Sequence, residues 1–279
     1  MWTIKPADKN AWEVRIFRIL KKLFIFLLFL SSSVCFTEDV NFTVVYNNIP
    51  FRGDLRTAWG ISIFIEGLEK NILFDTGGDG SILLSNMEKL KIDPEEIETV
   101  ILSHIHLDHI GGIEEILEKN KNISLYIPSS FPVEFKNFIG KNTKEVISVK
   151  EPIKVCKSVY STGELGTRMK EQSLVIDSKR GLIIVTGCAH PGIVNIVQFA
   201  KNYFKSEIYL VFGGFHLMAY NEEQVNDIIR QLRKLGVRKV GPSHCTGGRP
   251  IDLFKEEWGR DFIELGCGAK MKVSLNDEN

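Results

Sequence analysis

The sequence has no excess of charge of either sign, since 35 Lys and Arg residues balance 35 Asp and Glu residues among 279. Proteins that bind nucleic acid usually carry a basic surplus, so we expect no nucleic-acid partner and predict a small-molecule substrate. The chain also contains no low-complexity linker. Its 44% hydrophobic and 25% charged content is typical of a soluble globular protein, and its length suits one α/β domain.

Cysteine and histidine are both scarce, and their placement is informative. The five cysteines show no CxxC spacing, which argues against a structural zinc site built from cysteine pairs. Cys188 and Cys245 lie close to histidines in the sequence. We interpret them as small buried residues beside a site rather than as thiolate ligands, although ligation stays open. The chain has only six histidines, so each one carries weight.

Three of these histidines occur in one stretch, SHIHLDHIGG, which follows an apolar run at Thr99–Leu102. The run predicts a buried strand, so the stretch forms a turn at the carboxyl end of that strand, where open sheets bind ligands. His104 and His106 are two residues apart and can reach one ion. Asp108 and His109 follow on the turn and could serve a second ion or its surroundings. Imidazole with carboxylate suits Zn²⁺. An inert polar turn is disfavoured, because groups this crowded need partners.

The other three histidines, His190, His216 and His244, occur in similar surroundings. Each lies close to glycine after an apolar run that predicts a strand. We therefore expect several strand ends to converge on one place, with no histidine used elsewhere.

These features resemble the metallo-β-lactamase superfamily, from Phe42 almost to the end of the chain. The resemblance rests on the HxHxDH string, on Asp75-Thr76-Gly77-Gly78 after a strand, and on single histidines in later glycine turns. Within the superfamily, the strings EQSL, TGCAHPGIVN, FGGFHL and SHCTG are most similar to the dihydropterin ribofuranosyl-aminobenzene phosphate synthase-like branch. The resemblance implies an α/β (α+β) fold, a four-layer αββα sandwich over residues 37–279.

Local patterns predict the elements of this sandwich. We expect a helix at Ser81–Leu90 with Ser81 as its N-cap. Ile153–Tyr160 is expected to be one strand, and Pro128–Gly140 a lid or short helix that contributes to the pocket. Other expected strands and helices are Asn41–Tyr46, Ile61–Glu66, Asn71–Phe74, Ile113–Lys119, Ile123–Ile127, Lys144–Val149, Glu171–Asp177, Leu182–Thr186, Pro191–Tyr203, Ile208–Phe212, Asn221–Leu235, Val237–Ser243 and Ile251–Trp258.

The resemblance also implies a set of metal ligands. His104, His106 and His190 would form a three-imidazole site with a fourth position open to water, as in catalytic rather than structural zinc sites. Asp108, His109 and His244 would form a second site. Asp75 would hold ligand histidines in place without binding metal, or cap a turn. We expect one or two Zn²⁺ per chain, with Mn or Fe as alternatives.

The activity implied is that of a metal-dependent hydrolase, in which metal-activated water attacks a small ester, amide or phosphate-bearing substrate. Asp108 and His216 are the candidate catalytic residues. One departure concerns the aspartate that bridges both metals in most dinuclear members, since Phe215 stands where we align it. His216, one residue later, could replace that ligand, bind substrate, donate a proton, or lie outside the metal site. Backbone N–H groups around Thr246 and Gly247 could hold an anionic substrate.

Other functions stay open. The protein could be a dihydropterin phosphate synthase-like enzyme, or a non-catalytic metal- or ligand-binding protein that kept the fold. A diiron protein is disfavoured, because that class carries glutamate where His106 stands. The neutral charge disfavours a nuclease.

Residues 1–36 combine a basic stretch, an apolar run at Leu23–Leu30 and small residues, as in a signal peptide. We predict a signal peptide or N-terminal membrane anchor, and hence an exported or membrane-anchored protein. The alternatives are an amphipathic helix in a cytoplasmic protein and a start codon assigned too early. Export would conflict with a cytoplasmic pterin intermediate as substrate.

Overall fold

The computed structural model describes residues 39–276, which lie within one compact unit at residues 38–279. The predicted signal peptide or anchor at residues 1–36 lies outside the described residues. Within the described part, no helix has the length and apolar character needed to cross a membrane.

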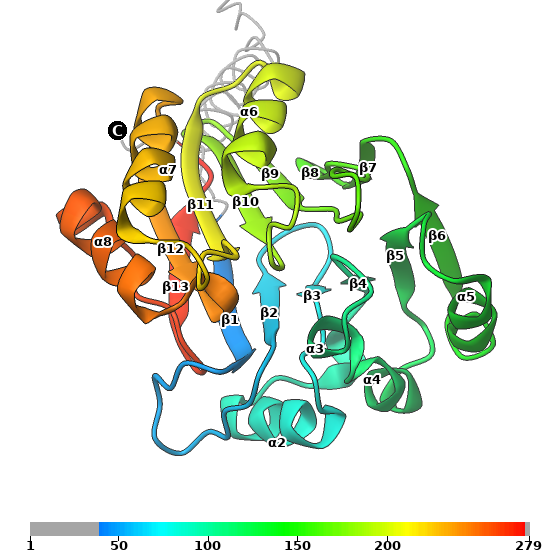
Figure 1. Ribbon diagram of the computed structural model, residues 1–279. Coiled ribbons are helices and arrows are strands. Elements are labelled where there is room, and N and C mark those ends of the chain that lie inside the picture. The colour runs from blue at the N-terminus through cyan, green and yellow to red at the C-terminus, as the bar shows by residue number, and fades with distance from the viewer. Residues whose placement is uncertain (1–38, 277–279) are drawn as a thin grey trace, which may run out of the picture. The chain divides into compact units, whose positions relative to one another are not determined.

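The described residues contain thirteen strands, which form two mixed sheets. The first sheet has the order β13-β1-β2-β3-β4-β5-β6 and the second has the order β12-β11-β10-β9-β8-β7 (Figure 1). The strands of the first sheet are β1 (Asp39–Asn47), β2 (Ile61–Glu66), β3 (Ile72–Phe74), β4 (Thr99–Ile101), β5 (Ser124–Pro128), β6 (Glu145–Val149) and β13 (Lys270–Ser274). Those of the second are β7 (Ile153–Cys156), β8 (Val159–Ser161), β9 (Leu174–Ser178), β10 (Gly181–Thr186), β11 (Ile208–Gly214) and β12 (Lys239–Ser243).

The two sheets pack face to face across an apolar core. Phe42 from β1 meets Phe212 from β11 edge to face, with ring centroids 5.0 Å apart. Residues alternate along each strand, so Phe74 points into this core while its neighbour Leu73 points to the outer face. Both faces of the central strands are therefore buried, which explains their nearly continuous apolar sequences.

Helices cover both outer faces. The first sheet packs against α2 (Gly80–Leu90), α4 (Ile113–Lys119) and α5 (Val133–Ile139), and the second packs against α6 (Ile193–Phe204), α7 (Glu222–Lys234) and α8 (Gly248–Trp258) (Figure 1). Short helical turns complete the unit at α3 (Leu107–Ile110), η1 (Pro94–Glu96), η2 (His244–Thr246) and η3 (Gly259–Asp261). The predicted αββα sandwich is confirmed.

Strand direction decides where the site forms. β3, β4, β5 and β6 run parallel in the first sheet, and β10, β11 and β12 run parallel in the second. The carboxyl ends of parallel strands lie at one edge of a sheet, and ligands bind there in open α/β sheets. The histidine-bearing turns follow β4, β10, β11 and β12.

Two local predictions need correction, and a third is confirmed in part. The N-cap of α2 is Asp79 rather than Ser81, because its Oδ1 accepts the Ile82 N–H at 3.0 Å. The segment 153–160 forms two strands, since Ser158 adopts a left-handed conformation (φ 61) that ends β7 and turns the chain into β8. The segment 128–140 contains the predicted short helix, α5, but none of its residues lines the cavity beside His190. The edge strand β13 was not predicted, because its sequence KMKVS is mostly polar and only half-buried.

Candidate metal centre

The predicted convergence of strand ends is confirmed. Asp75 follows β3 and the histidine motif follows β4, while His190, His216 and His244 follow β10, β11 and β12. All six histidines of the chain meet at this place, where ring centroids of neighbouring pairs lie 4.1–5.2 Å apart. Two glycines allow this approach. A side chain at Gly187 would strike the Ser103 hydroxyl from the opposite sheet, and one at Gly214 would strike the Gly187 carbonyl.

His104, His106 and His190 form the first ligand group. One nitrogen of each ring lies within 4.8 Å of the others. His104 Nε2 and His106 Nδ1 are 3.0 Å apart, close to the ~3.3 Å that two nitrogens occupy around tetrahedral Zn²⁺. His190 Nε2 is buried without a hydrogen-bond partner. An orphaned buried nitrogen beside two converging nitrogens fits a divalent metal.

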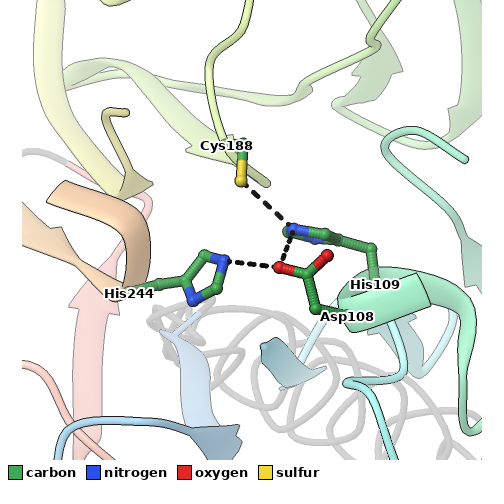
Figure 2. Close-up of side chains that lie close together, drawn as sticks. All are labelled: Asp108, His109, Cys188 and His244. Carbon is green, nitrogen blue, oxygen red and sulfur yellow. Dashed lines mark hydrogen bonds and ion pairs between the residues drawn. The ribbon is translucent and has the colours of Figure 1, made fainter. Parts of the chain in front are cut away.

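Asp108, His109, Cys188 and His244 form the second group, with ligand atoms within 4.8 Å of one another (Figure 2). Asp108 Oδ2 lies 3.4 Å from His109 Nε2 and 3.2 Å from His244 Nε2. Cys188 Sγ lies 3.2 Å from His109 Nε2. Carboxylate, imidazole and thiol donors in this arrangement also fit a borderline divalent metal.

Buried polar groups hold the histidines from behind. Asp75 is fully buried and accepts the Ser103 N–H at 2.6 Å, the Ser103 hydroxyl at 2.7 Å and His109 Nδ1 at 2.7 Å. Because Ser103 donates its proton to Asp75, it accepts from His104 Nδ1 at 3.0 Å. Asn48 Oδ1 accepts from His244 Nδ1 at 2.8 Å. These bonds turn the Nε2 atoms of all three histidines toward the ligand groups, and Asp75 has the contacts that the resemblance implies.

The electrostatics of the two groups differ. Burial and neighbouring imidazoles lower the pKa of His104, and burial also lowers the pKa of His106 and, to about 4, that of His190. These rings are therefore neutral, as metal ligands must be. Burial alone would lower the pKa of His109, but the Asp75 and Asp108 carboxylates raise it to about 10. The two carboxylates therefore favour a positive charge at the second group, which is a proton on His109 in the metal-free protein and would be replaced by a bound cation.

The family model described as the metallo-β-lactamase superfamily matches residues 61–199. The 7,8-dihydropterin-6-methyl-4-(β-D-ribofuranosyl)-aminobenzene-5′-phosphate synthase of Methanocaldococcus jannaschii is 33% identical, over 81% of this chain and 92% of that protein. The chain belongs to the metallo-β-lactamase superfamily. The similarity to the dihydropterin synthase-like branch is confirmed by the same relative.

Solved structures agree with this membership. Tm1679, a metal-dependent hydrolase of the β-lactamase superfamily, superposes with a TM-score of 0.73 at 26% identity, over 84% of this chain and 99% of that chain. The metallo-β-lactamase fold protein YhfI from Bacillus subtilis has a TM-score of 0.62 at 16% identity, over 84% and 100% of the two chains, and shows the shared fold.

His216 lies at the site but in neither of the first two ligand groups. It is exposed, it has a left-handed backbone (φ 55), and its ring centroid lies 4.3 Å from that of His190. Its ligand atom groups instead with Cys188 Sγ and Cys245 Sγ, all within 4.8 Å of one another. Phe215 is buried and packs on Phe254 of α8, so no carboxylate follows β11 to bridge the two groups.

The predicted substrate contacts at Thr246 and Gly247 differ from each other in the structure. Thr246 is buried, and its hydroxyl donates to the Ser243 carbonyl at 2.6 Å and accepts the Phe215 N–H at 3.0 Å. Its side chain therefore joins two turns and is not free to bind substrate. Gly247 lines a cavity of about 330 Å³ with His244 and Met218, so its predicted role stays open.

The sequence alone did not reveal the role of Glu171. This carboxylate is buried and accepts three backbone N–H groups, those of Cys188 at 2.9 Å and of Ala189 and His190 at 2.8 Å each. Burial raises its pKa to about 7 despite these bonds. It holds the turn in which Ala189 is left-handed (φ 59), and thereby places both Cys188 and His190. In the sequence, Glu171 stood out only as the first residue of the predicted strand Glu171–Asp177 and of the EQSL string, and neither feature indicated this role.

A cavity of about 520 Å³ opens beside His190. Besides His190 it is lined by Leu165, Gly166, Thr167, Arg168, Met169, Pro191 and Asn195. It adjoins the first ligand group, and Arg168 is its only charged lining residue.

Proposed function

We propose that the protein is a Zn²⁺-dependent hydrolase that acts on a small substrate carrying a phosphate or carboxylate group. The observation that supports this most directly is the pair of adjoining ligand groups, in which His190 Nε2 is buried and unpaired. Three imidazoles in the first group leave one position open, as in catalytic zinc sites.

A divalent ion bound there lowers the pKa of water and polarises a carbonyl or phosphoryl oxygen. The protein's own contribution is placement. Asp75 and Asn48 fix the orientation of His109 and His244, and Glu171 fixes the turn that carries His190. No serine or cysteine nucleophile is required for this chemistry.

Arg168 supports the anionic character of the substrate. It lines the cavity beside His190, so its guanidinium can pair with a phosphate or carboxylate while the scissile bond lies over the ligand groups. This pairing would supply binding energy but take no part in bond cleavage.

The test combines metal content with turnover of a panel of phosphodiesters, phosphomonoesters, carboxylic esters and amides. The wild type is expected to hold one or two Zn²⁺ per chain in the first two ligand groups and to hydrolyse an anionic member. His106→Ala should lose metal and activity together. Arg168→Ala should raise KM by about tenfold or more at nearly unchanged kcat, because an ion pair made equally in substrate and transition state affects binding alone. A metal-loaded wild type that cleaves nothing in the panel would contradict the hydrolase proposal.

A synthase-like activity is the second candidate. It is favoured by the 33% identity to the Methanocaldococcus jannaschii synthase, which extends over 92% of that protein. Formation of the ribofuranosyl-aminobenzene phosphate product by the metal-loaded chain would establish it. Metal binding without either activity would instead support a non-catalytic metal- or ligand-binding protein.

We also propose that residues 1–36 direct export or tether the protein to a membrane, and that an exported protein does not use the pterin intermediate. Cell fractionation that recovers only an uncleaved chain in the cytosol would contradict both statements. A cleaved or membrane-associated chain would support them.

A further inference from the structure

A third group of potential ligands adjoins the two already described. It consists of Cys188 after β10, His216 after β11 and Cys245 in η2, and their ligand atoms lie within 4.8 Å of one another. Both cysteines are buried, at 3% and 5% exposure, whereas His216 is open to solvent. Three turns from three neighbouring strands thus present two sulfur atoms and one imidazole to the same point.

The other two cysteines of the described region have different surroundings. Cys156 lies in the core between the sheets. Cys267 Sγ contacts Asn86 Nδ2 at 3.4 Å and the Val45 carbonyl at 3.5 Å, in the core under α2. No group of potential metal ligands found in residues 39–276 includes either of them. Among the described cysteines, only Cys188 and Cys245 therefore place sulfur atoms at the candidate metal centre.

The backbone around this third group is unusually constrained. Ala189, His216 and His244 all adopt left-handed conformations, with φ of 59, 55 and 52. Such conformations are costly for residues other than glycine and persist where the surrounding structure enforces them, often at functional sites. A side chain at Gly214 would lie 2.7 Å from Cys245 Sγ, so glycine at that position is what lets the thiol face the cluster.

We propose that Cys188, His216 and Cys245 form a further metal position that takes a thiophilic divalent cation such as Zn²⁺. Two thiolates and one imidazole are donors that soft and borderline ions prefer. Sulfurs on one tetrahedral Zn²⁺ lie about 3.8 Å apart, which small side-chain rotations can reach from a separation within 4.8 Å. Three protein ligands would leave a fourth position open.

Cys188 links this position to the second ligand group. Its Sγ also lies within 4.8 Å of the ligand atoms of Asp108, His109 and His244. One thiolate would therefore bridge two cations, in a chain where no carboxylate follows β11. In this assignment, His216 binds the metal ion together with two thiolates. The assignment does not depend on which reaction the protein catalyses.

The test uses Cd²⁺ as a spectroscopic probe, because thiolate binding to Cd²⁺ produces an ultraviolet charge-transfer band. The full chain is prepared metal-free in a Cys35→Ser background, kept reduced with a phosphine, and titrated with Cd²⁺. We expect a band with the amplitude of two thiolates. Cys245→Ser should halve that amplitude and remove one equivalent of bound metal. His216→Ala should weaken the last equivalent by about tenfold or more.

Cys156→Ser is the matched control and should leave both the amplitude of the charge-transfer band and the number of Cd²⁺ ions bound per chain unchanged. Circular dichroism of each variant verifies folding, and the exposed His216→Ala substitution keeps the test informative if Cys245→Ser misfolds. A wild-type band of one thiolate that Cys245→Ser does not alter would overturn the proposal, since Cys188 would then serve the second group alone. Absence of a thiolate band would overturn it as well. Neither result bears on hydrolysis, which is measured separately.

Discussion

Each buried ligand histidine of the centre has one ring nitrogen engaged by the protein. Nδ1 of His104, His109 and His244 bonds to Ser103, Asp75 and Asn48 respectively. These bonds place a proton on Nδ1 of all three rings, and Nε2 is the atom that faces the ligand groups. His106 differs, because its Nδ1 is the atom that faces His104.

Glu171 leads to a prediction about pH at this scale. Its pKa in the folded protein is about 7, against an ordinary value of 4.5, because it is buried. The folded state then binds the proton more tightly than the unfolded state, so this group makes stability fall as pH rises from about 4.5 to about 7. The shift corresponds to about 3 kcal/mol at 1.36 kcal/mol per pH unit.

Urea denaturation of the metal-free protein at pH 5 and pH 8 measures the effect. The unfolding free energy of the wild type should fall from pH 5 to pH 8 by more than that of Glu171→Gln, whose amide at position 171 cannot titrate. Glu118→Gln, exposed on α4, is the control and should follow the wild type. Identical pH profiles for wild type and Glu171→Gln would show that the buried carboxylate does not titrate in this range.

At the scale of elements, each histidine-bearing turn follows a short, mostly buried strand. β4 and β10 are buried along their whole length, so they fix the direction in which the following turns leave the sheets. Gly187 permits the turn after β10 to approach Ser103 in the turn after β4. The geometry of the ligand groups is therefore a property of strand ends rather than of flexible loops.

The corrected N-cap of α2 gives a prediction about a single element. Asp79→Ala removes the side-chain acceptor of the Ile82 N–H and should lower the unfolding free energy by about 1 kcal/mol. Ser81→Ala should cost less, because the Ser81 hydroxyl only donates to Asp79 at an exposed position. The urea concentrations at which the two variants are half unfolded show which of the two residues caps the helix. A larger loss in Ser81→Ala would restore Ser81 as the residue that caps the helix.

At the scale of the whole unit, the residues of the candidate metal centre come from both sheets. His104, His106, Asp108 and His109 come from the sheet that contains β4, whereas His190 and His244 come from the sheet that contains β10 and β12. A cation bound by both sets would connect the halves of the sandwich and bind the folded state alone.

Removing metal should therefore lower thermal stability. Free Zn²⁺ at 100 times its Kd contributes about 2.7 kcal/mol per site, and this contribution disappears with a chelator. Scanning calorimetry should show a lower Tm after EDTA treatment and recovery on addition of Zn²⁺. In His106→Ala, EDTA treatment should lower the Tm by less than in the wild type. An unchanged Tm in the wild type would mean that metal does not bridge the sheets.

Much of the fold could be predicted because its signals are local. Apolar runs define the buried strands, and the amphipathic spacing of Val225, Ile229 and Leu232 defines α7. Errors occurred where neighbouring residues compete for one role, as Asp79 and Ser81 do at the start of α2. The break at Ser158 was missed because serine carries no strong signal for a left-handed turn.

The sequence by itself determined that histidines and a carboxylate end several buried strands, because side-chain alternation and glycine turns are visible within a few residues. Only the tertiary structure decided how these groups pair. Asn48 and His244 are 196 residues apart, Glu171 reaches across to the turn after β10, and Cys188 meets both His216 and Cys245. Such contacts depend on which strands become neighbours and in what register. That choice is made by packing of the whole core, and no local stretch of sequence encodes it.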